Sequence, residues 1–257
     1  MKWMALVCIA LALAVVGSVG ETTTHFNVKY SDPAAATPGA GQTLEDAYKA
    51  VNNYFGNLPK SIKVVVVDGD EMDNVGKQVE AFSAWNHRSS TIVLRDKTLK
   101  DKKSLDVVAR HEICHLALND LLERKGEKDF AWTEEGICMV VSREPMDDVK
   151  VAKYIVAHGF KSPAEIAKAI DSDDYPTCKN GYLQSYSLCK FIASRFGLGA
   201  LVRMVKSPTA SFDAAFRQQT GASFDTVYKA WKASVTENAR GIPVSQTVSL
   251  RGALSLN

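Results

Sequence analysis

The sequence lacks the extremes of composition that mark several protein classes. Its 31 Lys and Arg against 29 Asp and Glu leave a formal net charge of +2, so no large field of one sign predicts a nucleic acid as partner. Hydrophobic residues make up 46% of the 257 residues, too many for a disordered chain. After residue 20 no apolar run approaches the roughly 20 residues needed to cross a bilayer. We therefore expect a folded, soluble mature protein without stable membrane insertion.

The N-terminus has the pattern of a secretory signal peptide. Residues 1 to 20 contain an early Lys, an apolar run from Ala5 to Val16, and small residues just before Glu21. This order predicts cleavage after Gly20, with an uncleaved membrane anchor as the alternative. The chain ends without an endoplasmic-reticulum retention signal, so we expect the mature protein to be secreted or to occupy the lumen of the secretory or vesicular pathway.

Four cysteines remain after the predicted cleavage: Cys114, Cys138, Cys178 and Cys189. An even number of cysteines in an oxidising compartment favours disulfide bonds. Of the three possible pairings we favour Cys114 with Cys138 and Cys178 with Cys189, because each bond closes a short loop. Four buried free thiols are the alternative.

The two halves of the chain differ in hydrophobic pattern. Residues 21 to about 126 mix helical spacing with three strand-like runs, which are Phe26 to Tyr30, Lys63 to Val67 and Thr91 to Leu94. Residues 127 to about 240 have almost wholly helical signals, followed by a tail over 241 to 257. No linker of flexible composition separates the halves. The sequence predicts one α+β unit over residues 21 to 257, with a small N-terminal mixed sheet and a mostly helical C-terminal half.

A candidate metal site lies in the segment from His111 to His115, His-Glu-Ile-Cys-His. It falls inside a helical pattern from Leu105 to Arg124, and residues four apart share one helix face. Both imidazoles can therefore bind one metal ion with Glu112 beside it; two solvated histidines on an ordinary helix are the alternative. Catalytic zinc takes three protein ligands, and Glu135 at the start of the next apolar helical run offers the third.

These residues carry a family resemblance. His111 to His115, followed by Trp132-Thr133-Glu134-Glu135-Gly136, resembles the gluzincin zinc metallopeptidases, with His-Glu-x-x-His and a downstream Trp-x-x-Glu-Gly. The resemblance implies a zincin-like, peptidase-MA-like fold, one Zn²⁺ per chain on His111, His115 and Glu135, and Glu112 as general base. Glu134 stays an alternative ligand. The sequence departs from many thermolysin-type members at Met139, where those have an acidic residue, so the groups that orient the histidines must come from elsewhere.

The ligand set predicts a zinc-dependent peptidase that acts on a peptide or protein. Zinc acidifies a bound water, and Glu112 takes its proton and passes it to the leaving amine. A further donor is needed for the tetrahedral oxyanion. We favour Tyr182, with Tyr186 and His158 as alternatives and core packing as the other role for either Tyr. By analogy with zinc peptidases, Thr91 to Leu94 is expected to be a sheet edge that pairs with extended substrate.

Two other functions fit the same residues. The first is a zinc-binding or zinc-free pseudoenzyme that acts as a secreted binding protein, although such a protein has no need of Glu112. The second is an aminopeptidase, which requires an acidic anchor for the substrate amine, and we identify no motif for one. The acidic run Asp171 to Asp174 lacks the Gly and distal Glu of a calcium loop and is expected to be a solvated turn.

Overall fold

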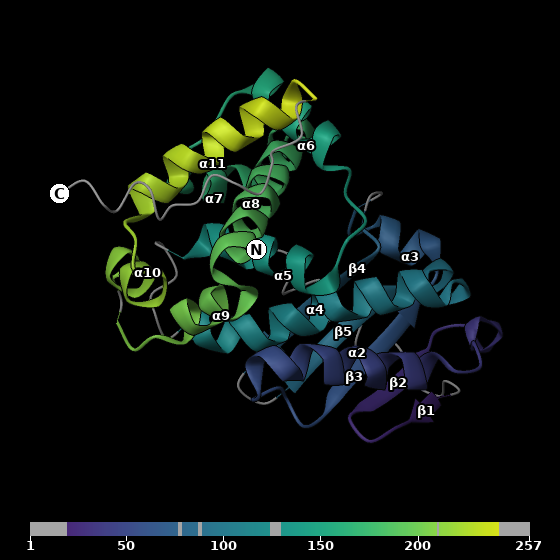
Figure 1. The fold of residues 1–257 in the computed structure, drawn as a ribbon. Coiled ribbons are helices and arrows are strands. Elements are labelled where there is room, and N and C mark those ends of the chain that lie inside the picture. Colours follow the sequence, from purple (N-terminus) through teal and green to yellow (C-terminus); the bar gives the residue numbers. More distant parts are fainter. Residues whose placement is uncertain (1–19, 77–78, 87–88, 124–129, 210, 242–257) are drawn as a thin grey trace.

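The computed structural model describes residues 20–76, 79–86, 89–123, 130–209 and 211–241. Within them the N-terminal part forms a five-stranded mixed sheet, with α2 (Ala40–Phe55) and α3 (Gly69–Asp73) between its strands, and the rest of the described chain is helical (Figure 1), which confirms the predicted α+β class. Residues 1–19 of the predicted signal peptide and residues 242–257 of the predicted tail lie outside the described part. Gly20, the predicted last residue of the signal peptide, is the first residue of β1 (Gly20–Thr22).

The sheet has the order β1-β2-β3-β5-β4. Its strands beyond β1 are β2 (Phe26–Tyr30), β3 (Ile62–Val67), β4 (Ala81–Asn86) and β5 (Ser89–Arg95). The three central strands β2, β3 and β5 run parallel, while β1 and β4 pair antiparallel at the two edges. All three predicted strand runs are strands of this sheet.

The prediction that Thr91 to Leu94 forms the sheet edge is wrong. These residues belong to β5, which pairs with β3 on one side and β4 on the other. The edge is β4, a strand that we did not predict. Its sequence Ala-Phe-Ser-Ala-Trp-Asn contains Ala and Asn, which are depleted in strands, so the local pattern was too weak to identify it.

Two long helices cover one face of the sheet. Helix α2 (Ala40–Phe55) and helix α4 (Lys102–Glu123) pack against each other and against this face (Figure 1). Alternate strand residues, among them Val28, Val64 and Ile92, enter the core beneath them, as the two-residue period of a strand requires. The opposite face carries a smaller core around Met72 of the short helix α3 (Gly69–Asp73). The 3₁₀ segments η1 (Pro33–Ala35) and η2 (Asp96–Lys100) complete this half.

A buried carboxylate fastens the loop between β1 and β2 to α2. Glu45 accepts hydrogen bonds from Thr23 Oγ1 (2.6 Å), from His25 N–H (2.7 Å) and from His25 Nδ1 (2.7 Å). Burial raises the pKa of Glu45, but these hydrogen bonds outweigh burial and hold it below its ordinary value. The His25 ring stacks on Tyr48 of the same helix, with centroids 3.9 Å apart.

The C-terminal half is helical in its described part. Its helices are α5 (Ala131–Ser142), α6 (Asp148–His158), α7 (Pro163–Ile170), α8 (Tyr175–Phe196), α9 (Leu198–Lys206), α10 (Phe212–Thr220) and α11 (Phe224–Ala239). Helix α5 packs against both α4 and α8 (Figure 1). The tight packing against α8 depends on Gly136, because a Cβ there would lie 2.7 Å from Cys189 Sγ and closer still to the Ser185 carbonyl oxygen.

The four cysteines of the described chain are free thiols in place of the predicted disulfides. Cys178 and Cys189 both lie on α8, eleven residues and therefore about 16 Å apart along the axis. A disulfide requires Cα atoms within about 7 Å, so that pairing is wrong. Cys114 and Cys138 are hydrogen-bonded neighbours on α4 and α5, and burial together with this bond raises the pKa of the Cys138 thiol.

Among the described helices, none combines the length and the apolar composition that a membrane span requires.

Candidate metal centre

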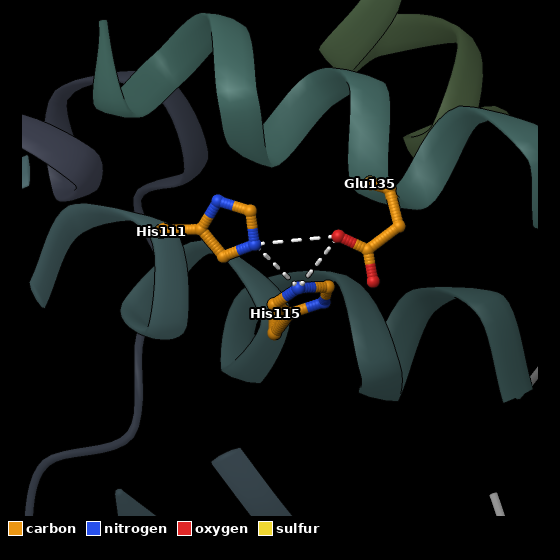
Figure 2. A group of neighbouring side chains, drawn as sticks. All are labelled: His111, His115 and Glu135. Carbon is orange, nitrogen blue, oxygen red and sulfur yellow. Dashed lines mark hydrogen bonds and ion pairs between the residues drawn. The ribbon is translucent and has the colours of Figure 1, made fainter. Parts of the chain in front are cut away.

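The centre forms where α4 and α5 meet. His111 and His115 project from one face of α4, and Glu135 projects toward them from the first turns of α5 (Figure 2). The two Nε2 atoms are 3.0 Å apart, and Glu135 Oε2 lies 3.3 Å from Nε2 of His111 and 3.4 Å from Nε2 of His115. Two imidazole nitrogens and one carboxylate oxygen thus converge on one point. This group can hold a metal ion.

The Glu135 oxygen that faces the two imidazoles, Oε2, has no hydrogen bond of good geometry in the described structure. Glu135 Oε2 is buried and has no hydrogen-bond partner of good geometry in the described part of the chain. Its other oxygen, Oε1, accepts a hydrogen bond of 3.2 Å from the Tyr182 hydroxyl on α8. Buried polar atoms normally have hydrogen-bond partners. A buried oxygen that faces two imidazoles and has no hydrogen-bond partner is suited to coordinate a cation.

Glu134, the alternative ligand, lies outside the group of converging donors. Its carboxylate lies 2.8 Å from Nδ1 of His115, on the far side of the ring from the converging Nε2 atoms. A helix turns about 100° per residue, which explains why neighbouring residues of α5 reach opposite sides of the same imidazole. The cluster within coordinating distance contains Glu135 and excludes Glu134.

A fourth carboxylate at the centre was missed by the sequence analysis. Glu144 Oε1 lies 2.6 Å from Nδ1 of His111, so each histidine has a carboxylate at its second ring nitrogen. Glu144 follows the end of α5 and reaches the centre through a turn at Arg143. No motif spacing marks this residue, although the missing acid at Met139 indicated that an orienting group had to come from another position.

Glu112 is buried beside the centre without being one of its converging donors. It is 6% exposed and hydrogen-bonds Ser83 of the edge strand β4. Burial raises the pKa of its carboxyl above the ordinary value, while His111 and His115 act in the opposite direction. A carboxylate with a raised pKa is suited to accept and release a proton.

The charges of the centre stabilise one another. Burial opposes ionisation of Glu135, but His115 and His111 outweigh it and hold its pKa far below the ordinary range. Burial likewise disfavours protonated His111, yet the neighbouring carboxylates of Glu135 and Glu144 raise its pKa to about 10. The pKa of His115 is raised against burial by Glu135 and Glu134. The carboxylates therefore create a strong local preference for positive charge.

Tyr182, the favoured oxyanion donor, lies at the centre, whereas the alternatives Tyr186 and His158 have other contacts. Burial and the charge of Glu135 raise the pKa of its hydroxyl, which keeps it a proton donor. Tyr186 instead accepts a hydrogen bond of 3.0 Å from Lys190. His158 is the last residue of α6, with Nδ1 2.8 Å from the Tyr154 carbonyl oxygen, so it has a structural role at a helix end.

The acidic run at residues 171 to 174 also has a structural role. Asp174 is the N-cap of α8 and accepts hydrogen bonds from the backbone N–H and hydroxyl of Thr177. A capping carboxylate at a helix start is a common structural arrangement.

No protein-family model matches the sequence, and no curated protein matches it. The residues of the centre are therefore the basis for inferring a function.

Proposed function

We propose that the protein is a zinc-dependent peptidase of gluzincin type with a zincin-like fold, exported by the signal peptide at residues 1 to 20. The observation that carries the proposal is the convergence of His111, His115 and Glu135, with Glu112 buried beside them. Two histidines and one carboxylate form a ligand set found in catalytic zinc sites, where one position stays open.

The spacing of the donors supports zinc. Donors at about 2.0–2.2 Å from a tetrahedral zinc ion would lie about 3.3–3.6 Å apart. The two distances from Glu135 to the imidazoles, 3.3 and 3.4 Å, fall in that range, and the distance of 3.0 Å between the imidazoles is slightly shorter. Bound zinc would supply a Lewis acid and a water with a pKa near about 7.

The proton steps belong to Glu112. Its carboxylate takes a proton from the attacking water and delivers it to the leaving amine. The residue follows His111 directly on α4, so its side chain is rotated about 100° from that ligand, toward β4 and out of the donor set. Tyr182 is held at the centre by its bond to Glu135 and donates to the oxyanion when substrate occupies the centre.

The edge strand β4 gives the substrate a place to bind. In the described part of the chain β5 is its one strand partner, and its Ser83 contacts Glu112. An exposed edge binds an extended peptide through main-chain hydrogen bonds. A peptide paired with β4 therefore passes beside the general base, which replaces our expectation for Thr91 to Leu94.

The decisive experiment compares the mature protein with two variants, Glu112→Gln and Glu237→Gln. Glu237 is exposed near the end of α11, so its variant controls for the loss of one carboxylate elsewhere. Each protein is analysed for metal and incubated with a mixed peptide library, whose products are identified by mass spectrometry. We expect one zinc per chain in all three, and cleavage by the parent and Glu237→Gln only, because loss of a general base costs about 10²- to 10⁴-fold in rate.

Three results would contradict the proposal. Equal cleavage by Glu112→Gln would remove Glu112 as the base. Zinc bound by the parent without cleavage of any peptide would favour the binding-protein alternative. A parent that binds no divalent metal would refute the centre itself.

A further inference from the structure

Each histidine of the centre has a carboxylate at Nδ1, the ring nitrogen that points away from Glu135. Nδ1 of His111 lies 2.6 Å from Glu144, and Nδ1 of His115 lies 2.8 Å from Glu134. A neutral imidazole carries one N–H, and a carboxylate can only accept a hydrogen bond. When a ring loses its second proton to bind a metal ion, its remaining proton is therefore kept on Nδ1, and the lone pair of Nε2 is directed at the point that Glu135 faces.

We propose that Glu144 and Glu134 are positioning residues that fix the tautomer and rotation of the two histidines and thereby set the affinity of the centre for its metal. The inference rests on the proposed metal centre and adds to it two residues outside the His-Glu-x-x-His motif. Partners of this kind also raise the basicity of a metal-binding histidine.

The chain reaches Glu144 through a strained turn. Helix α5 ends at Arg143, the only non-glycine residue of the described chain with a positive φ (58°). The N–H of Arg143 donates a hydrogen bond to the Val140 carbonyl oxygen (3.3 Å), and the N–H of Glu144 donates one to the Met139 carbonyl oxygen (3.2 Å). This reversal turns the chain back across the end of α5, where Glu144 meets His111.

The left-handed conformation costs a residue with a Cβ about 1 kcal/mol or more. Glycine adopts it freely, and the chain uses glycine at the C-terminal caps of α2 and α10. Strained backbone persists where surrounding contacts hold it in place. The contact of Glu144 with His111 is such a contact, directly after the strained residue.

Glu144 has no competing electrostatic role in the described structure. Among the described residues it pairs with no Lys or Arg, and its other contact is Ser142 Oγ at 3.5 Å. Its side chain is 20% exposed and that of Glu134 17% exposed, so both bonds lie in surroundings where hydrogen bonds of charged groups are strengthened. A surface ion pair, by contrast, contributes little.

The test measures zinc affinity by competition with a chelator, on metal-free protein. The variants are Glu144→Gln and Glu134→Gln, with Glu237→Gln as the matched control and Arg143→Gly to separate the turn from the carboxylate. We expect each of the first two to bind zinc about 10- to 100-fold more weakly than the parent. The control should bind as the parent does, and so should Arg143→Gly, because glycine keeps the turn.

A second measurement separates positioning from a general loss of structure. Circular dichroism and the thermal midpoint of each metal-free variant report folding, and ¹⁵N NMR of the zinc-loaded protein reports which ring nitrogen of His111 is protonated. We expect a mixed or altered signal for His111 in Glu144→Gln only. Glu144→Asp, which keeps the charge on a shorter side chain, should recover part of the affinity.

Three outcomes decide the matter. Parent-like affinity in a folded Glu144→Gln or Glu134→Gln would overturn the assignment for that residue. Weaker binding that only follows a lowered thermal midpoint, with an unchanged His111 signal, would also overturn it, because the effect would then be structural. If the parent itself binds no zinc, or binds it equally well after His111→Ala, the proposed metal centre fails instead.

Discussion

Replacing Gly136 with Ala should destabilise the protein, although Ala is the better helix former. The new Cβ would lie 2.7 Å from Cys189 Sγ and nearer to the backbone oxygen of Ser185 on α8. Real Cβ atoms do not approach backbone this closely, so α5 must move away from α8. Overpacking of this kind costs about 1–3 kcal/mol, and a backbone obstacle that cannot rotate away places Gly136→Ala near the upper end. The higher helix propensity of Ala offsets about 1 kcal/mol of this cost.

The net loss is therefore about 2 kcal/mol. For a chain of this size it lowers the thermal midpoint by roughly 4–8 °C. Calorimetry of the metal-free protein measures that midpoint, and urea titration measures the loss in the free energy of unfolding. Gly199→Ala on α9 is the control, because its Cβ would meet only the end of the Arg203 side chain, at 3.1 Å, and it should be neutral or slightly stabilising. Since Glu135 precedes Gly136, zinc affinity should fall as well. A Gly136→Ala protein as stable as the parent would refute the close packing of α5 on α8.

Three further outcomes follow from described contacts. Tyr182→Phe removes the donor to Glu135 Oε1 and the proposed oxyanion donor, so kcat on a peptide should fall about 10²- to 10³-fold while zinc stays bound; an unchanged kcat would exclude Tyr182 from catalysis. The pKa of Glu45 is lower in the folded protein than in the unfolded chain, where it is about 4.3. The ionised carboxylate therefore stabilises the fold above the unfolded pKa, and this stabilisation is lost as pH falls through the folded pKa. Glu45→Gln should thus cost about 1–3 kcal/mol at pH 7 and progressively less below pH 4 in urea titrations, and a difference that does not depend on pH would contradict this. A peptide map without reduction should contain no link between Cys178 and Cys189, since finding one would require α8 to be unwound.

Residues whose placement depends on local helix geometry were predictable. His111 and His115 share a face because four residues make about one turn, so the sequence alone brings them together once the helix is recognised. Glu135 required more, since its approach depends on how α5 packs on α4. The resemblance supplied that information, and the structure places this carboxylate beside the imidazoles.

Residues whose placement depends on tertiary contact were not predictable. Glu144 reaches His111 through a left-handed turn at an arginine, a residue type that gives no sign of that conformation. The edge strand β4 was hidden by Ala and Asn, and its ladder with β5 stabilises it where propensity does not. The pairing of Cys178 with Cys189 failed for the opposite reason, because a short separation in sequence becomes a long one on a continuous helix.

A contribution to folding stability does not explain why so many charged groups lie at the centre. Glu112, Glu134, Glu135 and Glu144 surround two imidazoles in a largely buried cluster. Buried ionic groups pay a desolvation cost that well-packed apolar residues of similar volume avoid. Four acids with two bases leave an excess of negative charge even when both imidazoles are protonated. A divalent cation at the convergence of the donors would balance that charge and occupy the point that Glu135 Oε2 faces, so the centre is arranged as a receptor for positive charge.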